Sequence, residues 1–205
     1  MYIPKNLMLT DPLAIENLIS EYGFGLLISQ DLETTRLPLL YNAKEGDKGT
    51  VIGHMARANP QWRNLSGQRV SVVFSGPHSY ISPTWYVSRP GVSTWNYASV
   101  QCFGTFQELN KEDTVNAIDA LIQKYEPEIA HNKTLMPTDY IEKLLKAVIG
   151  FKVVVDEIQA KEKLGQQKKT EDQLGVYEAL RHSVHSESRQ LAEYMKKRGL
   201  GDGSK

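Results

Sequence analysis

One short stretch of the chain alternates hydroxyl and aromatic side chains in a way that could hold a ligand. It follows a β-branched run, Val70–Val73, which is typical of a buried strand, and the pair Gly76-Pro77, which predicts a turn. Hydroxyls donate hydrogen bonds to phosphate or carbonyl oxygens and aromatic faces cover flat rings, so the stretch suits a planar, phosphorylated ligand. The alternative is a Pro-rich hairpin with a half-buried aromatic cluster. The side chains concerned are Ser79, Tyr80, Ser82, Thr84, Trp85 and Tyr86.

A second candidate lies at the expected end of a strand, where Arg57 and Asn59 stand two residues apart. The guanidinium of Arg57 is a planar fork of donors that suits a phosphate, and Asn59 adds an amide donor. In an extended segment these two side chains point the same way, so both could face one anion. The alternative is a solvated strand end at which Trp62 docks on the core.

Other residues of these regions each have two possible interpretations. His54 either bonds a ligand or is a core histidine, and a metal role is disfavoured because no second histidine or carboxylate stands at a ligand spacing. Trp95 and Tyr97 either extend the flat-ligand pocket or pack across strands. Cys102 falls in an apolar strand, which favours a core position over a reactive thiol.

Lysine and glutamine are concentrated in the late run Lys161–Lys169. The run predicts a solvated linker, or side chains that close over an anionic ligand or contact nucleic acid. The last two predicted helices also carry positive charge, but residues 182–185 lack the compact turn of a helix-turn-helix motif. Apolar side chains in the polar context of these helices predict a two-fold dimer; they are Leu174, Val176, Leu180, Leu191 and Met195.

The composition indicates one ordinary globular domain, with or without an appendage. The chain has 205 residues, of which 40% are hydrophobic and 23% charged. Lys+Arg and Asp+Glu both number 24, so the basic excess typical of nucleic-acid binding is absent from the chain as a whole. The single cysteine excludes an internal disulfide, and no apolar run is long enough to span a membrane. We therefore expect a cytoplasmic protein.

The remaining elements predict a mainly β, α+β fold, a small antiparallel barrel with peripheral helices. Helices are expected from Asp11-Pro12, from Asn110 with its apolar face at Ile118, Leu121, Ile122 and Tyr125, from Thr138 to Gly150, from Thr170 with a capping box, and over Ser186–Arg198. Residues 199–205 are expected to fray. Strands are expected at Gly25–Ser29, Leu37–Tyr41, Thr50–Met55, Val70–Ser75, Ala98–Leu109 and Phe151–Asp156.

Several blocks together resemble the PaiB family of FMN-binding negative transcriptional regulators. They are Met1–Pro4, His54–Gln61, Phe74–His78, Tyr80–Tyr86 and Thr94–Tyr97, with Lys161–Lys168 continuing the similarity. The resemblance implies an FMN-binding split β-barrel related to pyridoxamine-phosphate oxidases, usually a homodimer with flavin at the subunit interface. It also implies repression of genes for degradative enzymes and sporulation.

What the resemblance implies for this chain is an FMN site in a split-barrel domain of residues 1–165. Residues 166–205 would form a helical extension packed on the barrel or the dimer interface. A regulator would bind DNA directly or through a DNA-bound partner, and the alternative is a flavin-dependent oxidoreductase of flavin-reductase or pyridoxamine-phosphate-oxidase type. The implied cofactor residues are Arg36, Leu37, His54, Met55, Ala56, Arg57, Asn59, Tyr80, Ser82, Thr84, Trp85, Trp95, Lys163 and Gln166.

Overall fold

The computed structural model describes residues 1–129, 134–135 and 137–204 of the chain. Its residues group into two compact units. Residues 11–74 and 100–159 are named the barrel unit, and residues 1–10, 75–99 and 160–205 the helical unit. The domain boundary expected after residue 165 stays a prediction.

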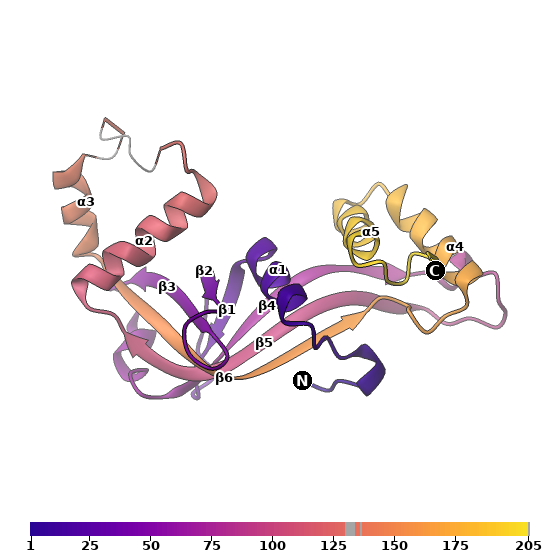
Figure 1. Cartoon of the computed structure of the whole chain (residues 1–205), viewed down its shortest axis with the longest axis horizontal. Helices are drawn as coiled ribbons and strands as arrows, with labels where there is room; N and C mark the ends of the chain where they lie inside the picture. The colour runs from indigo at the N-terminus through magenta and orange to yellow at the C-terminus, as the bar shows by residue number, and fades with distance from the viewer. Residues whose placement is uncertain (130–133, 136, 205) are drawn as a thin grey trace. The chain divides into compact units, whose positions relative to one another are not determined.

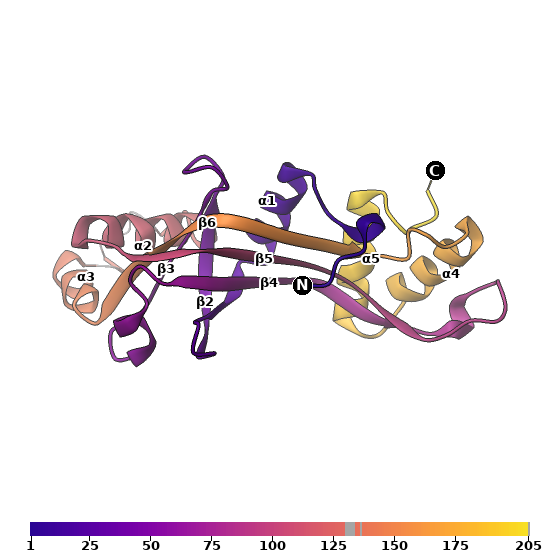
Figure 2. The ribbon, with the colours of Figure 1, turned by 90° about the horizontal axis from the view of Figure 1, so that it is seen from below.

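Six antiparallel strands close into a barrel in the order β1-β2-β3-β6-β5-β4 (Figure 1). This confirms the barrel expected from the strand signals. Three strands, β4, β5 and β6, are long, run side by side (Figure 2) and have residues in both units. The bounds are β1 Phe24–Ile28, β2 Thr34–Asn42, β3 Thr50–Ala56, β4 Arg69–Ile81, β5 Thr94–Glu108 and β6 Val148–Lys163.

The core of the barrel unit consists of side chains at alternate strand positions, as the period of a half-buried strand requires. The rings of Phe106 and Phe151 stack with their centroids 4.9 Å apart. Gly53 leaves the space that Leu39 fills, since a Cβ at Gly53 would lie 2.5 Å from Leu39 Cδ2. Residues exposed by at most 2% include Leu27, Leu39, Val51, Met55, Val72, Phe74, Val100, Cys102, Phe106, Phe151 and Val153. Cys102 is therefore a core residue, and burial raises its pKa to about 12.

Helices α1 and α2 begin at the predicted caps. Asp11 accepts a hydrogen bond from the amide of Leu13 at the start of α1 (Pro12–Glu21), and Asn110 accepts one from the amide of Asp113 at the start of α2 (Lys111–Tyr125). The apolar residues Ile15, Leu18 and Ile19 of α1 are buried, whereas Tyr22, which follows the helix, is only partly buried. The predicted face of α2 is only partly right, because Leu121 is buried but Tyr125 is 55% exposed.

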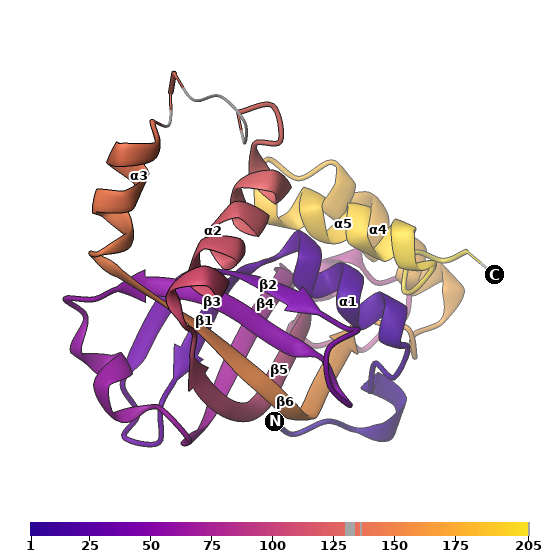
Figure 3. The same cartoon turned by 60° about the vertical axis from the view of Figure 1, so that its left-hand side comes forward.

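The helix predicted from Thr138 does not extend to Gly150, and the contact between α2 and Gly150 explains why a glycine stands there. Figure 3 shows α2 lying against β2 and β3. Its buried positions include Thr114 and Ala117, and a Cβ at Gly150 would lie 2.5 Å from Thr114 Oγ1. The helix α3 (Thr138–Leu145) ends before β6, and Gly150 lies inside that strand. Gly150 therefore allows α2 to approach β6 closely, and it does not end a helix.

The turn predicted at Gly76-Pro77 is also wrong, since β4 continues to Ile81. A Cβ at Gly76 would lie 3.0 Å from the carbonyl oxygen of Ala98 in β5. Glycine thus lets the two strands approach closely. The hydroxyl–aromatic stretch therefore begins inside a strand and not in a loop, and only its end, η3 (Pro83–Trp85), leaves the sheet.

The helical unit contains α4 (Thr170–Arg181), α5 (Ser186–Arg198) and the short helix η1 (Lys5–Leu7). Helix α5 has its predicted bounds. The capping box predicted at Thr170 is absent, because the N-cap of α4 is Lys169 and no side chain caps it. Asp172 instead accepts a hydrogen bond of 2.8 Å from the amide of Ser88, and this bond holds the pKa of Asp172 below its usual value.

Two other expectations for this unit change. Of the five apolar residues that predicted a dimer, Val176, Leu180, Leu191 and Met195 are buried, whereas Leu174 is 45% exposed, so most of them belong to the core of the unit. The described part of the tail, residues 199–204, is packed and not frayed: Gly201 and Asp202 are buried, and the amide of Gly203 donates to Gln173 Oε1 at 3.3 Å. None of the helices in the described residues is long and apolar enough to cross a membrane.

Candidate functional site

Arg57 stands just after β3 and is held by three backbone carbonyls and a ring. Its amide donates to the carbonyl of Ala147 at 2.8 Å. Its Nε and Nη2 donate to the carbonyls of Lys146 and Val148 at 3.1 and 3.0 Å. The guanidinium lies 5.8 Å from the ring centroid of Trp62. Among the described residues Nη1 has no hydrogen-bond partner, so an oriented, exposed donor remains for an anion.

Asn59 has a structural role, and the ligand contact that its spacing predicts stays a prediction. It caps η2 (Pro60–Asn64), because its Oδ1 accepts from the amide of Gln61 at 3.0 Å. Its Nδ2 donates to Thr35 Oγ1 in β2 at 2.9 Å. The amide therefore braces the turn that carries Arg57 against β2. One N–H of Nδ2 remains for a ligand beside Arg57.

Sequence reasoning missed the residues around this brace. Gln61 is 5% exposed, donates to the carbonyl of Glu33 at 2.8 Å and accepts from Thr35 Oγ1 at 2.6 Å. With Thr34, Asn59 and Pro60 these residues line a pocket of about 270 Å³. Its polar lining of hydroxyls and amides suits the polar part of a ligand. Local sequence does not mark Gln61, because its partners Thr35 and Glu33 stand 26 and 28 residues earlier.

The other expected cofactor residues of the barrel unit differ in the exposure of their side chains. Arg36 and Ala56 are exposed, and Arg36 follows Thr35 in β2. The side chains of Leu37 and Met55 are 8% and 2% exposed, because they face the barrel core. A role for these two residues in binding a ligand stays a prediction.

His54 contains one of the buried polar atoms that lack a partner. Its Nδ1 is inaccessible and makes no hydrogen bond within the part of the chain that the structure describes. Burial lowers the pKa of His54, so its ring is neutral at neutral pH. A neutral imidazole can donate or accept a hydrogen bond. An orphaned buried polar atom is costly, and a bound ligand is one way to satisfy it.

In the helical unit, Ser82 and Thr84 form a compact hydroxyl turn at the end of β4. Ser82 Oγ accepts from the amide of Thr84 at 3.2 Å and lies 2.8 Å from Thr84 Oγ1. Ser82 is the N-cap of η3, and Trp85 ends that turn half-buried. The two hydroxyls share one hydrogen bond and retain further capacity for a ligand.

Exposed aromatic rings lie together on β4 and β5. Tyr80 and Trp95 are 46% and 53% exposed. Trp95 contacts Tyr80 and His78 edge-to-face, with centroid separations of 6.3 and 5.9 Å. Rings that are exposed and in contact with one another form a candidate surface for a ligand or a partner. The three rings are named the aromatic platform.

The late basic run is not a linker at its start, which corrects the sequence interpretation. Lys161, Glu162 and Lys163 end β6, and the first two are buried. The ammonium of Lys163 donates to the hydroxyl of Thr94. The side chain of Gln166 is used locally, since its Nε2 donates to the carbonyl of Glu162 and its Oε1 accepts from the amide of Leu164, both at 2.8 Å.

Each unit, taken by itself, contains residue types that suit a planar phosphorylated ligand. The barrel unit has an oriented guanidinium, a braced polar turn and a neutral histidine. The helical unit has exposed rings, free hydroxyl capacity and an ammonium. The residue types therefore fit a flavin nucleotide, and the assignment of each expected cofactor residue stays a prediction.

Known proteins resemble the chain in sequence and in fold. Residues 1–157 match the model of a family described as "Putative FMN-binding domain". Protease synthase and sporulation protein PAI 2 of Bacillus subtilis is 37% identical over 202 residues, which are 95% of this chain and 96% of that protein.

Two solved structures share the fold. The FAD and heme binding protein from Mycobacterium smegmatis has a TM-score of 0.57 at 18% identity, over 77% of this chain and 74% of that one. The flavocytochrome Anf3 from Azotobacter vinelandii has a TM-score of 0.58 at 14% identity, over 80% and 73%. At such identities the likeness establishes the fold. The family match and the 37% identity establish more: this chain belongs to the FMN-binding domain family, as its sequence blocks predicted.

Proposed function

We propose that the chain is an FMN-binding transcriptional regulator. Membership of the FMN-binding family supports the cofactor, and the name of the relative links that protein to protease synthesis and sporulation. The observation that carries the proposal is the aromatic platform, whose exposed rings stand beside the hydroxyl turn of Ser82 and Thr84.

Each group of expected cofactor residues suits one part of FMN by its chemistry. FMN, when bound, supplies a redox-active ring and a phosphate dianion. Arg57 and the polar turn that Asn59 braces would hold the phosphate through charge-assisted bonds. Tyr80 and Trp95 would cover the flat ring, and Ser82 and Thr84 would bond its polar edge. Lys163 would add positive charge.

We also propose a two-fold homodimer. The aromatic platform leaves rings in water on β4 and β5, and a second copy that covers them would remove apolar surface from solvent. Light scattering at micromolar concentration should give twice the 23.1 kDa of one chain. A mass of one chain at that concentration would rule the dimer out.

A visible spectrum of the purified protein, followed by titration with FMN and riboflavin, tests the cofactor. Preference for FMN is expected because only FMN has the phosphate. Equal affinity for the two would refute the phosphate assignment. Regulation is tested by DNA binding at several salt concentrations, with and without FMN. Rapid NADH oxidation with no effect on DNA would instead identify an oxidoreductase.

A further inference from the structure

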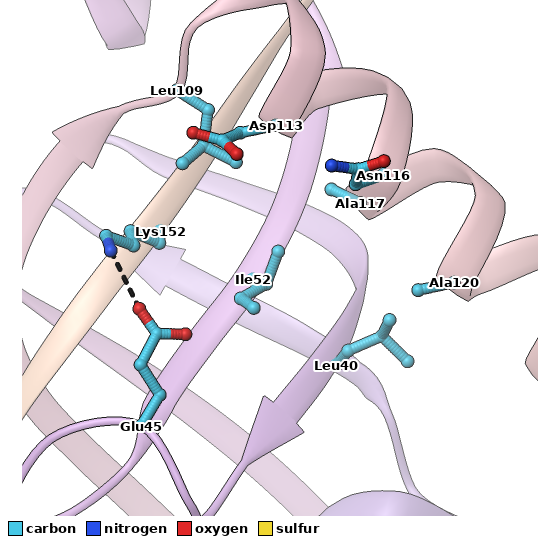
Figure 4. Close-up of a pocket in the computed structure, with 9 residues that line it drawn as sticks. All are labelled: Leu40, Glu45, Ile52, Leu109, Asp113, Asn116, Ala117, Ala120 and Lys152. Atoms are coloured by element: carbon cyan, nitrogen blue, oxygen red, sulfur yellow. Dashed lines mark hydrogen bonds and ion pairs between the residues drawn. The ribbon is translucent and has the colours of Figure 1, made fainter.

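The barrel unit has a second pocket, which shares no lining residue with the expected flavin site. Its volume is about 230 Å³, below the roughly 300 Å³ at which pockets for drug-sized ligands begin. It lies between α2 and the outer face of β2, β3 and β6 (Figure 4). The lining residues are Leu40, Glu45, Ile52, Leu109, Asp113, Asn116, Ala117, Ala120 and Lys152.

One end of this pocket is charged and held in place. Lys152 Nζ donates to Glu45 Oε1 at 2.7 Å, and Thr50 Oγ1 donates to Glu45 Oε2 at 3.1 Å. These bonds fix the carboxylate, and the bond from Lys152 holds the pKa of Glu45 below its usual value. The Lys152 side chain is 29% exposed. An ammonium has three N–H donors, so Lys152 keeps donors for a second anion.

Helix α2 adds two polar groups with spare capacity. Asp113 Oδ2 accepts from Asn110 Nδ2 at 2.8 Å, but no cation pairs with Asp113 among the residues that the structure describes. The amide side chain of Asn116, one helical turn further on, makes no hydrogen bond within the described ranges. The pocket therefore offers a carboxylate for a cation and an ammonium for an anion.

The other end of the pocket is apolar. In Figure 4, Leu40 and Ala120 lie away from the Glu45–Lys152 pair, and Ile52 lies between these two ends. Ala117 is buried beneath Asn116 on the same helix. A ligand with a charged head and a short aliphatic tail matches this division, because each part meets groups of its own kind.

We propose that this pocket binds a small aliphatic α-amino acid. Asp113, with Asn116 one turn further along α2, receives the ammonium, and Lys152 receives the carboxylate. The aliphatic side chain rests on Ile52, Leu40 and Ala120. The head group carries both charges, because the pocket presents an ammonium on β6 and a carboxylate on α2. This inference is independent of the flavin proposal, since it uses other residues of the barrel unit.

Isothermal titration of the purified full chain with L-leucine tests the proposal, beside isopentylamine and 4-methylpentanoate, which each lack one charge. Saturable binding of leucine is expected, with both analogues at least tenfold weaker. No saturable binding of leucine, or an analogue that binds as well as leucine, overturns the proposal.

Two matched variants locate the site. Ala120→Phe fills the apolar end, while Gln123→Phe places the same ring at an exposed position of α2 outside the pocket. We expect at least a tenfold loss of leucine affinity for Ala120→Phe and an unchanged affinity for Gln123→Phe. Equal losses, or no loss in Ala120→Phe, overturn the assignment. FMN titration of both variants should match the parent chain, which separates failure here from failure of the flavin proposal.

Discussion

The Arg57→Ala substitution tests where the phosphate of FMN binds. Nε and Nη2 of Arg57 are occupied by the carbonyls of Lys146 and Val148, so the guanidinium keeps its orientation without a ligand. Little side-chain entropy is then lost when Nη1 bonds a phosphate oxygen. Bonds to charged groups contribute about 1.5–3 kcal/mol, which corresponds to a loss of FMN affinity of roughly tenfold to hundredfold.

Lys163→Ala is the comparison. Lys163 is a point charge on a flexible stem, although Thr94 holds its ammonium. Its removal should cost about 1 kcal/mol or less, or roughly fivefold in affinity. Arg57→Lys keeps the charge but loses the planar fork, so its affinity should fall between those of the parent chain and Arg57→Ala.

Fluorescence titration with FMN and with riboflavin at two salt concentrations measures these differences. Riboflavin has no phosphate, so its affinity should not change in Arg57→Ala. Circular dichroism and urea unfolding check that the turn at residues 146–148 survives the loss of two hydrogen bonds. A larger loss for Lys163→Ala than for Arg57→Ala, or an equal loss of riboflavin and FMN affinity, would refute the placement of the phosphate.

Three further predictions concern stability. Glu162→Gln breaks a buried ion pair, in which Glu162 Oε1 accepts from Arg198 Nε at 2.7 Å and from a tyrosine hydroxyl at 2.6 Å. Urea unfolding should show that the free energy of unfolding falls by about 3–5 kcal/mol. A fall below about 1 kcal/mol would contradict the burial argument. Gly53→Ala places a methyl group 2.5 Å from Leu39 Cδ2 and should lower the free energy of unfolding by about 1–3 kcal/mol. An unchanged unfolding midpoint would show instead that Leu39 moves to accommodate the methyl group. The pKa of Glu45 is lower in the folded state, so its contribution to stability is present above the unfolded pKa and is lost as pH falls through the folded pKa. Glu45→Gln should therefore lower stability at pH 7 but not at pH 2. Equal losses of stability at both pH values would exclude the ionised pair as the cause.

Much of the candidate site was predictable as residue types and not as geometry. The blocks His54–Gln61 and Tyr80–Tyr86 pointed to Arg57 and to the Ser82–Trp85 turn, because donors and rings are visible in any sequence. Which donors stay available depends on partners far along the chain. The carbonyls that occupy Arg57 come about 90 residues later, with separations of 89 and 91, and the amide of Asn59 is occupied by Thr35 in another strand. No local pattern reports such pairings.

Local signals by themselves determined the elements whose causes are local. The caps Asp11 and Asn110, the bounds of α5 and the core position of Cys102 all follow from side chains within a few residues. These signals were enough to predict the antiparallel barrel.

Only the tertiary structure decided the role of the glycines and of the late lysine run. Gly76 and Gly150 were interpreted as breaks, because glycine is permissive in isolation. In the fold they lie inside strands, where the backbone of Ala98 or the side chain of Thr114 approaches too closely for a Cβ. Lys161 and Glu162 indicated a linker by charge, yet both are buried in β6. Close approach and burial depend on partners distant in sequence, so no window along the chain could reveal them.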